Sequence, residues 1–197
     1  MKDKGINEAI SIILFILMVF IACGSSNPKT YSDHQVKQLV YQNKLTKAQI
    51  YTVLNGQLKT AISIHKSKFN CSERDLRIAT VAVICLETGN LKSKSVMVNN
   101  LFGIKKVKGR PDFTMKTNEY NGKKMIHLDQ QFASFFSLTD CISGFYIFLS
   151  KDRYAKVRKA TNYKTFLKEM HKAGYATDPN YTDKVLRVAE EIEATTK

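Results

Sequence analysis

A strongly apolar segment follows Ser72. Apolar residues over 76–86 occupy nearly every face of one segment, which is typical of a helix buried on all sides. Ser72 is a suitable N-cap, with Asp75 three residues later, and Gly89 is a suitable stop. The pattern therefore predicts a central helix whose last turn carries a single carboxylate, Glu87.

The segments on either side of this helix have different periods. Residues 35–68 are helical but irregular. From Phe113 to Glu119 the chain alternates residue by residue, and the Asn121–Gly122 pair that follows is a strong signal for a tight turn. We therefore predict a small antiparallel lobe over about residues 104–135.

Three further helices are expected after the lobe. The first is capped near Ser137, and the second covers about residues 162–173 and stops at Gly174. The third begins with Asp178 as N-cap and Pro179 at its first position. Helices, a small sheet and again helices predict an α+β domain that is mostly helical.

The first 23 residues do not belong to this domain. An unbroken run of 14 apolar or small residues covers positions 9–22. As a helix it would span roughly 21 Å, short of the ~30 Å hydrocarbon core, and this length favours a signal-peptide core over a membrane span. We assign residues 1–23 to a signal, 24–34 to a linker and 35–197 to the domain.

The end of the apolar run resembles a bacterial lipoprotein cleavage box. A small residue precedes Cys23 and a polar stretch follows it, although Phe20 replaces the usual leucine. We expect a lipid on Cys23 that attaches the protein to a membrane of the cell envelope. An uncleaved anchor and ordinary secretion are the alternatives, and all three place the domain outside the cytoplasm.

The net charge of +14 favours an anionic partner, such as nucleic acid, an acidic membrane face or an acidic wall polymer. The basic residues are mostly dispersed lysines, so no specific nucleic-acid partner is expected.

Cys85 and Cys141 lie in apolar runs and are expected to be packed thiols, while a Cys71–Cys85 disulfide stays open. No spacing suggests a metal site. The histidines are interpreted as surface or satisfied residues: His34, His65, His127 and His171.

Glu87 is the main candidate for chemistry. An apolar helix desolvates its carboxyl, and the negative end of the helix dipole disfavours the charged form. Both effects raise the pKa, and a carboxylic acid that keeps its proton near neutral pH is suited to general acid catalysis. The alternative is a solvated carboxylate, or one that pairs with a lysine such as Lys92.

Three ordered motifs resemble the bacterial glucosaminidase family, glycoside hydrolase family 73. They are "LETGNLKS…NNLFGIKK" (86–106), "TNEYNGKKMIHLDQQFASFFSLTDCISGFYIFL" and "AGYATDPNYTDKV" (173–185), and the similarity runs from about residue 72 to 193. The resemblance implies a lysozyme-like α+β fold with a substrate groove beside the hairpin lobe. It also implies cleavage of the β-1,4 bond after N-acetylglucosamine in peptidoglycan, with no cofactor.

Carried over position by position, the resemblance implies that Glu87 is the proton donor. Glu119 matches the second acidic position and would act as general base, activating water. One alternative is a solvated carboxylate on the hairpin with no role in catalysis. In another, the N-acetyl group of the substrate assists and Glu119 matters less.

The same resemblance points to residues that would contact or shape the substrate site. Tyr175 is expected to orient the sugar or its acetamido group, whereas Tyr181 is either a substrate contact or a packed residue with a satisfied hydroxyl. Asn99 and Asn100 are expected to shape the groove through loop hydrogen bonds, with sugar contact secondary. Phe102 is either a groove wall or a core aromatic.

Three positions depart from the family pattern. Asn90 and Leu91 replace the usual Trp-Gly pair, and Ala133 replaces an arginine, which removes an expected ion pair. The leading hypothesis is a peptidoglycan glucosaminidase whose partners are glycan strands and, through its N-terminus, a membrane. The alternatives are a catalytically degenerate peptidoglycan-binding domain and a lysozyme-like muramidase or lytic transglycosylase.

Overall fold

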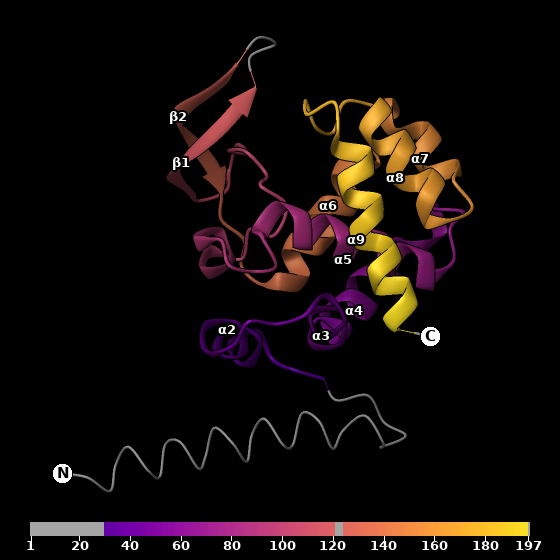
Figure 1. The fold of residues 1–197 in the computed structure, drawn as a ribbon, viewed down its shortest axis with the longest axis horizontal. Helices are drawn as coiled ribbons and strands as arrows, with labels where there is room; N and C mark the ends of the chain where they lie inside the picture. Colours follow the sequence, from indigo (N-terminus) through magenta and orange to yellow (C-terminus); the bar gives the residue numbers. More distant parts are fainter. Residues whose placement is uncertain (1–29, 121–123, 197) are drawn as a thin grey trace, which may run out of the picture. The chain divides into compact units, whose positions relative to one another are not determined.

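A computed structural model describes residues 30–120 and 124–196, and Tyr31–Lys197 form one compact unit (Figure 1). The assignments at residues 1–23, including Cys23, and the turn at Asn121–Gly122 lie outside the described residues. No helix within the described ranges is long and apolar enough to cross a bilayer. The elements are α2 (Asp33–Gln42), α3 (Lys47–Val53), α4 (Asn55–His65), η2 (Lys66–Lys68), α5 (Glu73–Thr88), η3 (Lys94–Val98), β1 (Asp112–Tyr120), β2 (Met125–Ala133), α6 (Leu138–Leu149), η4 (Asp152–Tyr154), α7 (Ala155–Lys159), α8 (Tyr163–Lys172) and α9 (Tyr181–Thr195).

The predicted central helix is confirmed as α5. Its N-cap, Ser72, accepts a hydrogen bond from the backbone N–H of Asp75 (3.0 Å), and Gly89 ends it in the left-handed region at φ 57°. Residues 78–85 are all buried, and α5 packs against α3, α4, α8 and α9. A helix covered on so many sides fixes the position of Glu87 in its last turn.

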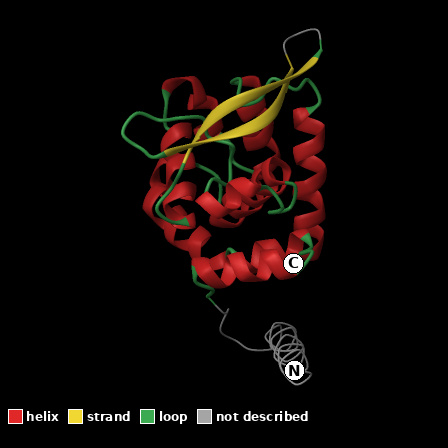
Figure 2. Ribbon diagram, turned by 90° about the vertical axis from the view of Figure 1, so that its left-hand side faces the viewer, coloured by secondary structure: helices red, strands yellow, loops and turns green. Residues whose placement is uncertain are grey.

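The predicted lobe is confirmed as a β1–β2 hairpin with antiparallel register from Asp112 opposite Ala133 to Tyr120 opposite Met125. Its base is held by the loop before it, because Ala133 donates its N–H to the carbonyl of Ile104 (3.0 Å). In Figure 2 the two strands cross the upper part of the face that is turned toward the viewer, in front of the helices. The helices therefore form the core, and the hairpin is an appendage joined at its base.

The helices after the lobe agree with the prediction except at one boundary. Ser137 caps α6, and Gly174 follows α8 with φ 78°. However, α9 begins at Tyr181 rather than at Pro179. The carboxylate of Asp178 accepts a hydrogen bond from the N–H of Asn180 (2.9 Å), so it stabilises the turn before the helix instead of capping it.

The first described helix begins earlier than residue 35. Ser32 accepts a hydrogen bond from the N–H of Gln35, and the Gln35 side chain accepts one from the N–H of Ser32, which makes a capping box for α2. Tyr31 is buried, so the packed unit extends into the segment predicted to be a linker.

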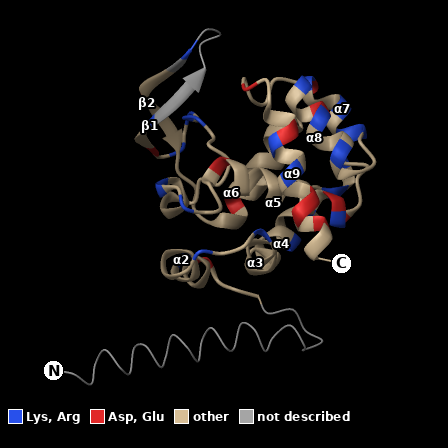
Figure 3. Ribbon diagram, viewed as in Figure 1, with Lys and Arg blue, Asp and Glu red and all other residues tan. Residues whose placement is uncertain are grey.

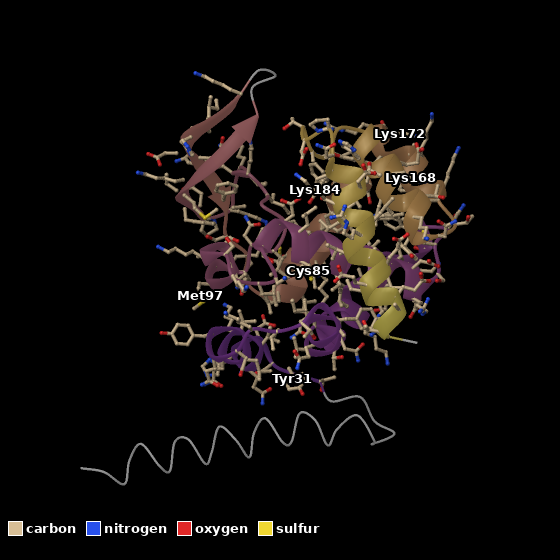
Figure 4. All side chains as sticks on the ribbon, viewed as in Figure 1. Tyr31, Cys85, Met97, Lys168, Lys172 and Lys184 are labelled. Atoms are coloured by element: carbon tan, nitrogen blue, oxygen red, sulfur yellow. The ribbon has the colours of Figure 1, made fainter. Side chains whose placement is uncertain are left out.

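The three cysteines in the described part are free and buried, which rules out the Cys71–Cys85 disulfide. Cys85 is labelled in Figure 4 on α5. Burial raises the pKa of each thiol to about 12. The sulfur of Cys141 accepts a hydrogen bond from the N–H of Leu101 (3.3 Å). These thiols are packing groups.

One histidine contradicts the expectation of surface or satisfied residues. His65 is buried, its ring stacks on Tyr146 at 5.8 Å between centroids, and its Nε2 has no hydrogen-bond partner in the described structure. Burial, together with Lys68, lowers its pKa. His34 and His127 are exposed, and His171 places Nδ1 2.7 Å from the hydroxyl of Thr182.

Candidate active site

The Glu87 carboxyl lies between the start of α9 and the loop that follows η3. Its Oε1 accepts a hydrogen bond from the Tyr181 hydroxyl (2.9 Å). Its Oε2 faces Gly103, where a Cβ atom would lie 3.6 Å from that oxygen. Gly103 has φ 61°, so glycine suits this position through its backbone conformation. The carboxyl is thus held on one oxygen and has space beside the other.

Burial controls the charge of Glu87. It raises the pKa of this carboxyl from 4.5 to about 7, while the hydrogen bond from Tyr181 acts in the opposite direction by stabilising the anion. The predicted upward direction is confirmed, and Glu87 is partly buried. At neutral pH a large fraction of Glu87 is therefore protonated.

Tyr181 matches one of its two interpretations, the packed residue with a satisfied hydroxyl. Its ring is buried at the start of α9, 5.5 Å from the His171 ring, and its hydroxyl is satisfied by Glu87. Apolar spacing along α9 predicted the packing. The acid partner is 94 residues away in the chain, so no local pattern could identify it.

Tyr175 joins the same aromatic cluster after the turn at Gly174. Its ring lies 5.8 Å from that of Tyr181 and meets Phe145 edge-on, with 6.0 Å between centroids and 90° between planes. Burial, followed by the nearby Glu87 carboxylate, raises the pKa of Tyr175, so it stays a neutral phenol. The structure therefore brings together the acid and both tyrosines of the closing motif.

The asparagine pair before Phe102 connects this loop to the base of the hairpin. Asn100 is fully buried and donates from Nδ2 to the carbonyls of Ile104 (2.9 Å) and Ala133 (2.8 Å). Asn99, at φ 60°, donates from Nδ2 to the carbonyl of Phe135 (2.8 Å). The expected loop hydrogen bonding is confirmed.

Phe102 packs in the core. Its ring stacks on Phe145 with 4.2 Å between centroids and an interplanar angle of 4°, and its side chain is almost completely buried. The geometry matches the core-aromatic interpretation. The backbone carbonyl of Phe102 also accepts a hydrogen bond from the Tyr175 hydroxyl (3.4 Å), so this loop contacts the aromatic cluster beside Glu87.

The replacement of Trp-Gly by Asn90 and Leu91 is accommodated by unusual backbone geometry. Gly89, Asn90 and Leu91 have φ values of 57°, 61° and 65°. A left-handed conformation costs a residue with a Cβ atom ~1–2 kcal/mol. The Leu91 side chain is buried, and its N–H donates to the hydroxyl of Thr88 (2.8 Å), so packing offsets this cost.

An ion pair joins the loop before the hairpin to α6, although Ala133 has no charge to contribute. Arg110 binds Asp140 through two hydrogen bonds (2.7 and 3.0 Å), and its guanidinium lies 4.7 Å from the centre of the Phe135 ring. This pairing lowers the pKa of Asp140. Sequence reasoning missed Arg110 because its partner is 30 residues away.

Glu119 lies in β1 opposite Ile126. Its side chain is outside the described part of the structure, and its separation from Glu87 stays a prediction. The groove between the lobes also stays a prediction.

A mostly helical domain with one small hairpin and a protonated carboxyl at the end of its central helix is typical of lysozyme-like glycoside hydrolases. The family model described as "Glucosaminidase: Mannosyl-glycoprotein endo-beta-N-acetylglucosaminidase" matches residues 76–194. The chain belongs to this family.

Named relatives agree with this assignment. The chain is 32% identical over 125 residues to the peptidoglycan hydrolase FlgJ of Vibrio parahaemolyticus, covering 58% of this chain and 40% of that protein. It is 31% identical over 122 residues to the exo-glucosaminidase LytG of Bacillus subtilis, covering 58% and 43%. The chain thus spans less than half the length of either relative. A mutant of a peptidoglycan hydrolase from Sphingomonas sp. A1 superposes with a TM-score of 0.60 at 26% identity, covering 72% of this chain and 92% of that one.

Proposed function

We propose that this protein hydrolyses the β-1,4 bond after N-acetylglucosamine in bacterial peptidoglycan. Membership of the glucosaminidase family and the similarity to named peptidoglycan hydrolases support the substrate class. The observation that carries the proposal is the Glu87 carboxyl, whose pKa burial raises to about 7. A group that is protonated near neutral pH can donate a proton to a leaving sugar oxygen.

In this proposal the two oxygens of Glu87 have different tasks. Oε1 accepts the Tyr181 hydroxyl, so the acidic proton resides on Oε2, beside Gly103. Glu87 transfers that proton to the glycosidic oxygen as the C–O bond breaks and the sugar develops oxocarbenium character. Tyr181 then stabilises the carboxylate that remains, since a donated hydrogen bond favours the charged form.

Glu119 is the proposed general base that activates the attacking water. An inverting mechanism of this kind requires carboxyl groups about 6.5–9.5 Å apart. In the alternative, the substrate's own acetamido group attacks the anomeric carbon and Glu119 assists binding. The two mechanisms differ in their dependence on Glu119, whereas both require Glu87.

Four further residues are proposed to act at the substrate site in different ways. Tyr175 orients the sugar or its acetamido group. Tyr181 positions the acid, and Asn100 with Phe102 shapes the groove from beneath through the loop that they hold.

Attachment to the cell envelope is part of the proposal. The apolar residues 9–22 and Cys23 would anchor the protein in a membrane, through a lipid or as an uncleaved segment. A net charge of +14 favours approach to an acidic wall.

Digestion of purified peptidoglycan, with mass analysis of the reduced products, tests this function. Reducing-end N-acetylglucosamine is the expected product, and Glu87→Gln should bind the glycan without releasing it. Reducing-end or anhydro N-acetylmuramic acid would instead identify a muramidase or a lytic transglycosylase. Binding by the wild-type protein with no released sugar would identify a degenerate binding domain.

A further inference from the structure

Three large apolar side chains around α2 are strongly exposed: Tyr41 (88%), Met97 (60%) and Phe136 (83%). Short contacts connect them. Lys37, one helical turn before Tyr41, donates from Nζ to the carbonyl of Met97 (3.2 Å). The residue before Phe136 donates its N–H to the carbonyl of the residue after Met97 (3.1 Å). We call this surface, formed by α2, residues 92–110 and Phe136, the α2 face.

The α2 face is also strongly basic. Residues 33–44 and 92–110 contain eight lysines and arginines against one aspartate, a net charge of +7. In contrast, α9 carries four acidic and two basic residues, a net charge of −2. Figure 3 shows basic positions on α2 and on the loops beside the hairpin. Exposed apolar side chains among lysines are typical of surfaces that bind anionic membranes.

The length of the chain before the described unit restricts which face can meet a membrane. Eight residues, 23–30, separate the apolar run from Tyr31 and reach at most about 28 Å when extended. A unit of this size has a diameter of about 40 Å, so a path around to its opposite face would need ~60 Å. A tether of this length favours surfaces close to Tyr31.

The α2 face is close to that attachment point. Tyr31 lies directly before Ser32, the N-cap of α2. Tyr31 and Met97 can both be located by their labels in Figure 4. The carboxylate of Asp33 accepts a hydrogen bond from the N–H of Leu138 (2.8 Å), two residues after Phe136. The start of the unit and the exposed apolar cluster therefore share one side.

We propose that the α2 face docks on the anionic lipid bilayer that holds the N-terminal segment. This inference rests on the proposed membrane attachment. Tyr41, Met97 and Phe136 enter the headgroup region, and the surrounding lysines neutralise lipid phosphates. In Figure 1 the hairpin end lies away from α2, so docking directs the hairpin away from the bilayer, toward the wall.

The sequence contains no tryptophan, so a single introduced tryptophan is the only source of tryptophan fluorescence. Phe136→Trp and Met97→Trp report on the α2 face, and Ile147→Trp is a matched control, because Ile147 is 58% exposed but lies on α6 about 14 Å along the helix from Leu138. The full chain, reconstituted in phosphatidylglycerol vesicles with brominated acyl chains, should show blue-shifted and quenched emission at positions 136 and 97. Position 147 should show neither effect. The quenching should weaken at 1 M salt, where the Debye length falls to ~3 Å.

Four results would overturn the proposal. If the chain floats with vesicles but positions 136 and 147 are quenched equally, or neither is, the docking is wrong while the attachment stands. Equal quenching in phosphatidylcholine vesicles contradicts the anionic-lipid assignment. A blue shift that persists in detergent and grows with protein concentration, without lipid quenching, shows that a second copy covers the face. A chain that does not float with vesicles at all rejects the attachment together with the docking.

Discussion

The end of α5 and the β1–β2 hairpin each carry one of the two proposed catalytic carboxylates, but they are held by different means. Several helices, among them α3, α4, α8 and α9, pack against α5, so Glu87 is positioned by the core. The hairpin is held at its base by the Ala133–Ile104 backbone pair, by Asn100 and by the ion pair of Arg110. An isolated two-stranded hairpin is marginally stable at best, so those few polar contacts matter more than their number suggests.

The contrast indicates that the two halves of the site respond to different perturbations. A change at Glu87 alters the chemistry while the helical core keeps its shape. A change at the hairpin base alters where the hairpin lies, and with it the position of Glu119. A substitution at Glu87 should therefore lower activity without lowering stability. A substitution at the hairpin base should lower both.

The largest effect is expected at the acid. Glu87→Gln should reduce peptidoglycan hydrolysis about 10³-fold, since general acid catalysis contributes ~10²–10⁴-fold, with the melting temperature unchanged or raised. Glu119→Gln should reduce the rate of hydrolysis by a smaller factor, because Glu87 still protonates the leaving group. The rate of soluble muropeptide release measures both. A Glu87→Gln enzyme with near wild-type turnover would contradict the assignment.

The next largest effect is expected at the join between the loop and the hairpin. Asn100→Ala removes the side-chain donor to the buried carbonyl of Ala133 and the acceptor of the Ile104 N–H (3.0 Å), which should lower the free energy of unfolding by about 3 kcal/mol. The Ile104 carbonyl keeps the N–H of Ala133 as its donor. Chemical denaturation measures this change. Asn43→Ala is the control, because Asn43 donates one partly buried hydrogen bond to Leu39 and should cost less than about 1 kcal/mol. Similar costs for the two variants would show that Asn100 does not hold the hairpin.

A smaller effect on stability is expected at the two ion pairs near the hairpin base, and it should differ between them. Arg110→Ala removes a two-bond pair with Asp140 and should destabilise the protein by about 1.5 kcal/mol. Lys106→Ala removes an exposed contact with Asp112 and should cost less than about 0.5 kcal/mol. Thermal unfolding of both variants at low salt tests the difference. The interpretation fails if the Lys106 variant is the less stable of the two.

The smallest effect is a shift in pH dependence. The proton on Glu87 must be present for catalysis, so activity falls as the pH rises through its pKa. Tyr181→Phe removes the hydrogen bond that lowers this pKa, so the alkaline limb should move upward by up to about one pH unit. Tyr163→Phe, whose hydroxyl donates to Glu193 away from the site, should leave the profile unchanged. A downward shift in the Tyr181 variant would reverse the proposed role.

Local signals predicted much of the fold, and the reasons are visible at particular residues. Ser72, Gly89 and Ser137 act on backbone groups within a few positions, so their caps could be identified from the sequence. The direction of the Glu87 pKa shift followed from the apolar helix that carries it. The start of α9 was placed two residues early because Asp178 and Pro179 form a turn with the same residue preferences as a helix start.

The remaining features depend on tertiary contacts that no spacing encodes. Tyr181 reaches Glu87 across 94 residues, and Arg110 reaches Asp140 across 30. His65 was expected to be satisfied, yet its burial against Tyr146 leaves Nε2 unpaired within the described structure. Such pairings are decided when helices pack, so residue type and position along the chain were insufficient to find them.

The central claim is that Glu87 keeps its proton near neutral pH. The measurement that tests it most directly is a pH titration of the Glu87 side-chain carboxyl by ¹³C NMR, with the resonance assigned by its loss in Glu87→Gln. The account predicts a midpoint of about 7, because burial outweighs the hydrogen bond from Tyr181. A midpoint near the ordinary value of 4.5 would contradict the account, since Glu87 would then be ionised where the proposed reaction needs an acid.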